Sequence, residues 1–325
     1  MIDNFDKLIK NAKTVGISGH VRPDGDCVGS CLAVYNYITT YFPQVSAQVY
    51  LEPIPNIFKF LKGADTIKSL DSFDEDMIFD LYIALDCSEG SRLGAADKYF
   101  SSAKTKVCID HHFSNSGFCD NSYIIPDDSS TCELVYNQIG KEKITKDIAE
   151  CLYTGIIHDT GVFQYSCCTE NTMAAAGYLM SMGIDYPRIC TDTYFTKTMT
   201  QNRMLGKALL SCKTYEDGKI IAAVITKEDM AEFNAKSKHL EGIVQQLRDT
   251  TGVEVAIFLY ELEDGEYKGS TRATGDVDLT VITGKFGGGG HKKAAGFSVE
   301  TSDPWGIVAQ LVDMVKAQFK ELEIN

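Results

Sequence analysis

Apolar and polar positions alternate in blocks along the first half of the chain. Four short apolar runs predict strands, at residues 14–19, 46–51, 81–85 and 106–109. Positions with helical period predict helices at residues 26–41, 131–140, 146–158 and 172–182. Apolar strands that alternate with helices are typical of a parallel sheet covered by helices on both faces. Ligands of such sheets bind beyond the carboxyl ends of the strands.

The pattern starts again after a polar stretch at residues 191–202. Strands are predicted at 220–226, 253–262 and 268–273, a hairpin turn at 263–266, and helices at 228–249, 276–285 and 305–321. A chain of 325 residues also exceeds what one hydrophobic core usually organises. We therefore expect an α/β protein with an N-terminal parallel-sheet domain (1–190), a linker (191–205) and a smaller C-terminal α/β domain (206–325).

Composition narrows the class of protein. Apolar residues make up 44% and charged residues 23%, which is ordinary for a globular protein. The formal net charge of −14 disfavours duplex DNA as a substrate, because such binding depends on many Lys and Arg contacts to phosphates. Small phosphorylated molecules stay open as substrates.

The expected cellular compartment is inferred from targeting signals and from the cysteines. No long apolar run or basic, apolar leader is present, which predicts a cytoplasmic protein with no membrane partner. The 11 cysteines are scattered, with no Cys-x-x-Cys pair. We expect them to be reduced, with Cys87, Cys108 and Cys151 buried as small apolar side chains.

Polar residues that suit metal binding follow the predicted strands. The first group is His20-Val-Arg-Pro-Asp24-Gly-Asp26, and Asp86 and Asp110-His111-His112 follow the third and fourth runs. His158-Asp159 ends an apolar helical stretch. Each group alone has an ordinary explanation: a solvated Pro-Asp-Gly turn, a helix cap or surface histidines. Their common place at one sheet edge favours a single site instead.

Charge balance at that edge calls for cations. Asp24, Asp26, Asp86 and Asp159 within a few Å of one another would repel and could not all ionise. Two divalent ions would offset them, with one carboxylate shared between the ions. Imidazole and carboxylate ligands without thiolate suit Mn²⁺ and tolerate Mg²⁺, Co²⁺ or Zn²⁺. We expect two Mn²⁺ ions that activate a water for attack on phosphorus.

A glycine run marks the second domain. Gly287 to Gly290 precede His291-Lys-Lys, and Ser-Thr-Arg272 lies upstream. Consecutive glycines expose backbone N–H groups, which favours an anion-binding nest over a flexible linker.

These motifs resemble the DHH phosphoesterases, whose name describes Asp110-His111-His112. The resemblance implies metal ligands at His20, Asp24, Asp26, Asp86, His111 and Asp159, with Asp86 as the bridge. It implies that His112 faces the substrate phosphate and that Asp110 orients the histidines, so that His112, Asp110 and Asp86 are the expected catalytic residues. Asn115 belongs to the third motif and is expected to bind substrate.

The Gly-Gly-Gly-His-x-x-Ala-Ala-Gly pattern is similar to the DHHA1 domain of one branch of this family. The resemblance implies substrate contacts from Arg272, Gly288, Gly289, Gly290 and His291. A compact chain of this type looks like the NrnA-like oligoribonucleases, which also remove phosphate from 3′-phosphoadenosine 5′-phosphate (pAp). Short RNA or small nucleotides are then the expected partners, in a possible homodimer. The alternatives are a phosphodiesterase of linear or cyclic dinucleotides (pApA, c-di-AMP), an exopolyphosphatase and a non-catalytic nucleotide sensor.

Overall fold

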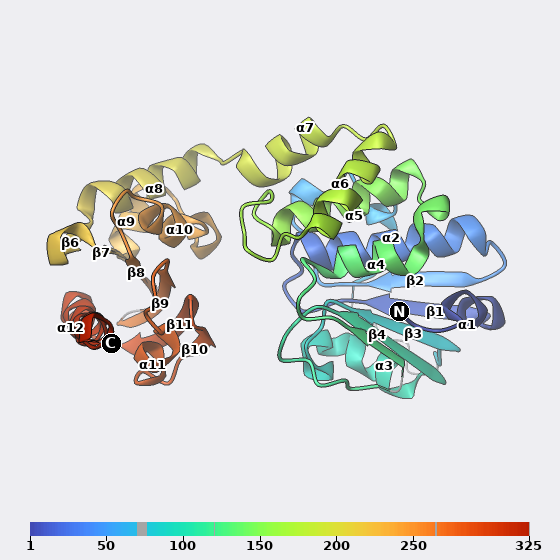
Figure 1. Ribbon diagram of the computed structural model, residues 1–325, viewed down its shortest axis with the longest axis horizontal. Coiled ribbons are helices and arrows are strands. Elements are labelled where there is room, and N and C mark those ends of the chain that lie inside the picture. Colours follow the sequence, from blue (N-terminus) through green and yellow to red (C-terminus); the bar gives the residue numbers. More distant parts are fainter. Residues whose placement is uncertain (70–76, 120, 264, 325) are drawn as a thin grey trace. The chain divides into compact units, whose positions relative to one another are not determined.

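The computed structural model describes residues 1–69, 77–119, 121–263 and 265–324 (Figure 1). The chain divides into two compact units, Met1–Thr196 and a second that begins at Lys197. The division falls inside the expected linker. That segment is nevertheless mostly helical, because the Thr198 hydroxyl accepts from the N–H of Gln201 and starts helix α8.

The first unit is built on a parallel sheet of five strands in the order β2-β1-β3-β4-β5. The strands are β1 (Thr14–Ser18), β2 (Ser46–Tyr50), β3 (Leu81–Leu85), β4 (Thr105–Asp110) and β5 (Asn121–Ile124). The chain moves from β1 outward to β2 and then returns to the other side of β1 for β3. The crevice at such a reversal, beyond the carboxyl ends of β1 and β3, is where open α/β sheets bind ligands.

Helices cover both faces of this sheet (Figure 1). They are α1 (Phe5–Asn11), α2 (Gly25–Tyr41), α3 (Asp97–Ser102), α4 (Thr131–Ile139), α5 (Lys146–Asp159), α6 (Glu170–Ser181) and α7 (Tyr186–Cys190). Along β3, Leu81, Ile83 and Leu85 belong to the core that includes α2, α4 and α5. Tyr82 and Ala84 point to the other face and its smaller core with α3. The continuous apolar pattern of the strand therefore reflects burial on both sides.

The second unit has a mixed sheet of six strands in the order β10-β11-β9-β8-β7-β6. The strands are β6 (Lys213–Tyr215), β7 (Ile220–Ile225), β8 (Val255–Glu263), β9 (Glu266–Ala273), β10 (Gly289–His291) and β11 (Ala294–Glu300). Only the β7–β8 pair among them is parallel.

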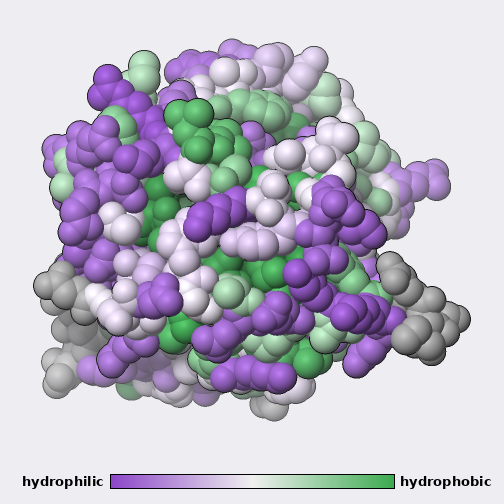
Figure 2. All heavy atoms as spheres, turned by 90° about the vertical axis from the view of Figure 1, so that its left-hand side faces the viewer, coloured by the Kyte–Doolittle hydropathy of each residue, from purple (hydrophilic) through white to green (hydrophobic). Residues whose placement is uncertain are grey.

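Helices also flank this second sheet, and they are α8 (Met199–Ser211), α9 (Lys227–Glu232), α10 (Ile243–Arg248), α11 (Leu279–Gly284) and α12 (Pro304–Ile324). One core joins the sheet to α11 and α12, and the other joins it to α8, α9 and α10. On the face seen in Figure 2 hydrophilic side chains predominate, and hydrophobic ones form separate small groups.

The expected fold class is confirmed: a parallel-sheet unit with helices on both faces and a smaller α/β unit. The single helix expected at 228–249 is wrong. Left-handed backbone at Asn234 (φ +49°) and Gly242 (φ +86°) divides it into α9, a 3-10 turn (Ser237–Leu240) and α10. The hairpin between β8 and β9 is present, although Asp264 of its turn lies outside the described residues.

Two smaller expectations concern cysteines and membranes. Cys87, Cys108 and Cys151 are buried, as expected. Within the described part of the chain, every helix is too short or too polar to traverse a bilayer.

Candidate metal centre

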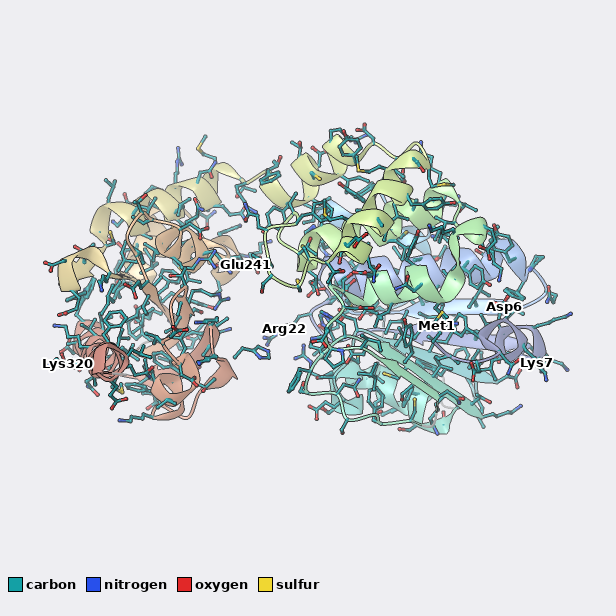
Figure 3. The ribbon with its side chains drawn as sticks, viewed as in Figure 1. Met1, Asp6, Lys7, Arg22, Glu241 and Lys320 are labelled. Atoms are coloured by element: carbon teal, nitrogen blue, oxygen red, sulfur yellow. The ribbon has the colours of Figure 1, made fainter. Side chains whose placement is uncertain are left out.

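The loop after β1 carries the first candidate ligands. His20 follows the strand, and Arg22 lies on this loop with φ +59° (Figure 3). Asp24 is the N-cap of α2, where its Oδ1 accepts from the N–H groups of Asp26 and Cys27 at 3.1 Å. Its Oδ2 lies 3.5 Å from His20 Nε2. One oxygen of Asp24 thus holds the helix and the other faces the imidazole.

Gly25 allows α2 to approach α5 closely. A Cβ at Gly25 would lie 2.4 Å from Cγ of His158 on α5, which is too close for any side chain. The ring of His158 is held by its Nε2, 3.0 Å from Thr193 Oγ1. Because Asp159 follows His158, this contact brings the first and last sequence motifs together.

Asp26 is fully buried and fixed by the start of α4. Its Oδ2 accepts from Thr131 N at 2.6 Å and its Oδ1 from Cys132 N at 2.8 Å. These N–H groups belong to the first turn of α4, where the helix dipole favours a negative charge. Burial, with the charges of Asp86 and Asp159 nearby, nevertheless raises the pKa of Asp26 well above its usual value. A cation beside this carboxylate would favour its ionised form.

Asp86 occupies the centre of the arrangement. It follows β3 in the left-handed backbone region (φ +56°) and is 2% exposed. Its Oδ2 lies 3.3 Å from His20 Nε2, and its Oδ1 lies 3.6 Å from His111 Nε2. Thr131 Oγ1 donates to the same Oδ1 at 3.1 Å. One carboxylate thus faces two histidines from different loops.

His111 lies among three carboxylates. Its Nε2 is 3.0 Å from Asp159 Oδ2, 3.6 Å from Asp86 Oδ1 and 4.0 Å from Asp26 Oδ2. Burial disfavours the charged ring, but these acids outweigh burial and raise the pKa of His111 to about 10. Burial also raises the pKa of Asp159, to about 6.

His20 behaves in the same way. Burial opposes its protonation, but hydrogen bonds to Asp24 and Asp86 raise its pKa to about 12. In the metal-free protein, protons on the imidazole rings therefore offset the charge of the carboxylates. A divalent ion would offset it in the metal-bound protein. Proton and metal compete for the same ligand atoms.

The donor atoms have the spacing of metal ligands. Two atoms at ~2.1 Å from one ion and at right angles lie roughly 3 Å apart, and wider angles give more. The contacts above run from 3.0 to 4.0 Å. Three compact groups lie among the described residues: His20 with Cys27 and Asp86, Asp86 with His111 and His112, and Asp26 with His111 and Asp159. Asp86 and His111 each belong to two of them. The residues therefore fit a pair of neighbouring cations.

A second layer of contacts orients His112. Its Nδ1 lies 2.8 Å from Asp110 Oδ1, and Asn115 Nδ2 donates to Asp110 Oδ2 at 2.7 Å. The hydrogen bond to Asp110 raises the pKa of His112. Asn115 is buried, and its Oδ1 accepts from Gly117 N. These bonds favour a positioning role for Asn115 over the expected substrate contact.

Comparison with protein families covers both units. The DHH family N-terminal domain matches residues 14–156, and the DHHA1 domain matches residues 217–321. The chain belongs to the DHH/DHHA1 family. The resemblance inferred from its motifs is confirmed.

Relatives of this DHH/DHHA1 chain include proteins that are named as enzymes. It is 26% identical to the bifunctional oligoribonuclease and PAP phosphatase NrnA of Bacillus subtilis, over 89% of this chain and 90% of NrnA. It is 28% identical to the cyclic-di-AMP phosphodiesterase PdeA of Listeria monocytogenes, over 97% of this chain and 49% of PdeA. A solved exopolyphosphatase-related protein from Bacteroides fragilis has the same fold, with a TM-score of 0.88, 28% identity, and coverage of 99% of this chain and 97% of that one.

Three groups near the ligands of the DHH domain were not predicted from the sequence: Cys27, Thr131 and the N–H of Cys132. Cys27 Sγ forms a compact group with His20 and Asp86, and it is not among the ligands that the resemblance implied. Thr131 and the N–H of Cys132 hold the carboxylates from α4, 105 and 106 residues after Asp26 for the two N–H groups and 45 residues after Asp86 for the Thr131 hydroxyl. A sequence signal exists for Thr131, since Ser129-Ser130-Thr131 marks a helix start.

Two predicted substrate residues of the DHHA1 domain, Arg272 and His291, lie on the strands either side of β11. Arg272 of β9 pairs with Ala294 of β11, and Ala294 pairs with His291 of β10. Arg272 and His291 are thus two strand spacings apart, roughly 10 Å. Gly289 and Gly290 of the glycine run lie in the edge strand β10, and the anion-binding nest stays a prediction. A Cβ at Gly290 would lie 2.5 Å from Ala294 O, so this glycine allows close strand pairing.

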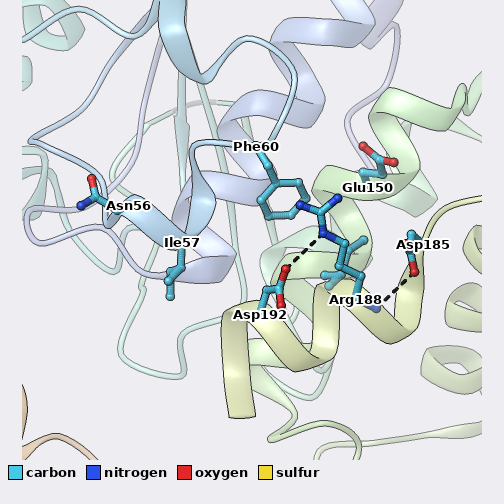
Figure 4. A pocket seen from close by; sticks show the side chains of 8 residues that line it. Asn56, Ile57, Phe60, Glu150, Asp185, Arg188 and Asp192 are labelled. Atoms are coloured by element: carbon cyan, nitrogen blue, oxygen red, sulfur yellow. Dashed lines mark hydrogen bonds and ion pairs between the residues drawn. The ribbon is translucent and has the colours of Figure 1, made fainter. Parts of the chain in front are cut away.

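The DHH domain also contains a cavity of about 370 Å³ that uses none of the predicted ligands (Figure 4). Arg188 extends beside the ring of Phe60, and its Nε donates to Asp192 Oδ2 at 3.1 Å. The remaining charged groups of the lining are Glu150 and Asp185. The one cation of the lining is therefore paired, which makes the cavity a poor site for phosphate.

Proposed function

We propose that this chain is a metal-dependent enzyme that cleaves short oligoribonucleotides to mononucleotides and removes phosphate from pAp. It is a hydrolase of phosphate esters, like the relatives named above. The observation that carries the proposal is the cluster of His20, Asp26, Asp86, His111 and Asp159 at the carboxyl edge of the parallel sheet. Such a cluster serves a reaction at phosphorus better than it serves binding alone.

The ligands divide between two ions. His20, Asp24 and Asp86 would hold one, and Asp26, Asp86, His111 and Asp159 the other, with Cys27 next to the first group. The oxygen and imidazole donors favour Mn²⁺, with Mg²⁺ or Co²⁺ as substitutes. When bound, such ions supply Lewis acidity that activates water and offsets charge on phosphoryl oxygens.

The chain's own residues bind and orient the substrate. Asp110 fixes the ring of His112, and in its protonated form this ring would donate to a phosphate and complement its charge. Arg272 and His291 would contact a second phosphate of the substrate, together with backbone N–H groups of Gly288, Gly289 and Gly290. The net charge of −14 disfavours long polyanions and therefore favours short substrates.

Cleavage of linear or cyclic dinucleotides is the second candidate. Its support is the similarity to PdeA over 97% of this chain. Exopolyphosphatase activity is a weaker candidate, suggested by the name of the related Bacteroides structure. A sensor that only binds nucleotides would not need the ligand cluster. The cytoplasmic location and the homodimer stay predictions.

A substrate panel tests the proposal. The purified chain would receive pAp, pApA, RNA of two to five nucleotides, c-di-AMP and polyphosphate with Mn²⁺, and the products would be identified by chromatography. We expect orthophosphate from pAp and mononucleotides from short RNA. The same reactions with excess EDTA should stop and should resume when Mn²⁺ is restored. Equal turnover with and without EDTA, or turnover of polyphosphate alone, would contradict the proposal.

A further inference from the structure

The DHHA1 domain contains a cavity of about 390 Å³ over one face of its sheet. The floor comes from β8 and β9, and the wall from α10 and the turn before it. Lys268, Ser270 and Arg272 alternate along β9, so their side chains share one face of the sheet. The volume lies within the roughly 300–1,000 Å³ of small-molecule sites.

Charge on this cavity is opposite to that of the whole protein. Among the described residues that line it are three cations, Lys238, Lys268 and Arg272, and one acid, Glu241. Three cations against one anion leave an excess of positive charge, whereas the chain has a net charge of −14. The rim therefore favours an anionic ligand such as a phosphate.

The floor of the cavity is apolar and aromatic. Leu240, Val244 and Phe258 are buried beneath it. The ring of Tyr260 lies beside that of Phe258, with centroids 5.8 Å apart and planes inclined by 31°. Flat aromatic groups bind well against such a surface.

One buried acceptor in the wall of the cavity lacks a hydrogen-bond donor in the described part of the chain. Gln245 Oε1 is buried, and among the described residues no donor reaches it. A buried acceptor without a partner is unfavourable, so such atoms are rare unless a ligand or water satisfies them. Gln245 also lines the cavity, so a turn of its side-chain amide would present this acceptor to a ligand that brings an N–H group.

We propose that this cavity binds the base of a nucleotide, that Gln245 Oε1 accepts from an amino group on that base, and that the cations of the rim hold its phosphate. This proposal rests on the proposed function, since it takes the ligand to be a nucleotide. It adds a residue that determines specificity. Adenine is the simplest test case, because its N6 amino group is its N–H donor at the Watson–Crick edge.

The test compares two ligands that differ in that amino group. Binding of AMP and of purine riboside 5′-monophosphate, which lacks it, would be measured by calorimetry on the full chain in EDTA, so that no turnover is needed. We expect AMP to bind about three- to tenfold more tightly, the range of one hydrogen bond. The variant Gln245→Leu should bind the two ligands equally.

Two further variants keep the test decisive. Gln246→Leu makes the same change at the exposed neighbour outside the cavity and should keep the preference for AMP. Gln245→Glu retains an acceptor and should also keep the preference for AMP. This variant can be measured even if Gln245→Leu does not fold. An undiminished preference in folded Gln245→Leu, or absence of AMP binding, would overturn the proposal. If no substrate of the panel were turned over but the preference for AMP persisted, the proposed reaction would be contradicted and the nucleotide site would still be supported.

Discussion

The ligand cluster of the DHH domain and the cavity of the DHHA1 domain differ in how their buried polar groups are satisfied. In the DHH domain each buried carboxylate of the cluster already holds donors from the protein, as Asp26 does with two N–H groups of α4. In the DHHA1 cavity Gln245 Oε1 has no such donor among the described residues. Ligands of an ion must be fixed before the ion arrives, because their spacing decides its affinity. A group that distinguishes between organic ligands is more selective when only the right ligand satisfies it.

The largest effect is expected from Asp86→Asn. Asparagine tolerates the left-handed backbone at this position, so the fold should persist while the shared charge is lost. We expect turnover with Mn²⁺ to fall by about 1,000-fold or more. Asp65→Asn, on the exposed 3-10 turn, makes the same change as a control and should be fully active. Activity near that of the unmodified chain in folded Asp86→Asn would remove the two-ion assignment.

Thr131→Val tests the pre-arranged donors. The change keeps the shape of a fully buried side chain and removes its hydrogen bond to Asp86 Oδ1. We expect the affinity for Mn²⁺ to fall about 10- to 100-fold, measured by titrating activity with the ion. Thr283→Val removes a buried hydroxyl in α11 of the other domain and should leave that affinity unchanged. Equal losses in the two variants would mean that Thr131 only stabilises the fold.

Metal binding should also depend on pH. Because the pKa values of His20 and His111 are raised to about 12 and about 10, both rings are protonated at neutral pH in the metal-free protein. An ion must displace these protons, so affinity should rise with pH by about tenfold per unit for each proton released. Calorimetry in buffers with different heats of ionisation would count the protons. An affinity for Mn²⁺ that is constant from pH 6 to 8 would contradict this prediction.

The smallest effect should come from the DHHA1 side. Arg272→Lys keeps the charge and loses the planar group that binds phosphate through two bonds. We expect KM to rise about three- to tenfold with kcat nearly unchanged, because this residue binds substrate away from the reacting atoms. Arg248→Lys, on α10 of the same domain, is the control, since Arg248 pairs with Asp249. A large fall in kcat would place Arg272 in the reaction itself.

Sequence reasoning recovers the parts of the molecule that depend on local pattern. Strand β3 and Asp86 could be predicted because a continuous apolar run ends at a carboxylate. The donors from Thr131 and Cys132 could not, since they depend on how α4 packs beside α2. Helix α8 was missed because its first turn lies in a polar stretch that reads as a linker.

The glycine run and the helix at 228–249 show the limits of local rules. Glycines suggest open loops, yet Gly290 permits strand pairing that only the fold reveals. Helical period continues through Asn234 and Gly242, although both adopt left-handed backbone. The orphan acceptor of Gln245 has no sequence signal at all, since it depends on what surrounds the side chain.

The wide spacing of the ligands along the chain has a consequence for synthesis of the protein. His20 and Asp159 lie 139 positions apart, and every compact group requires residues from at least two separate segments. At 5–20 residues per second, a ribosome needs roughly 7–28 s to pass from the first ligand to the last. Until α5 is complete, a growing chain has only part of the ligand set, so ion loading should follow translation of this helix.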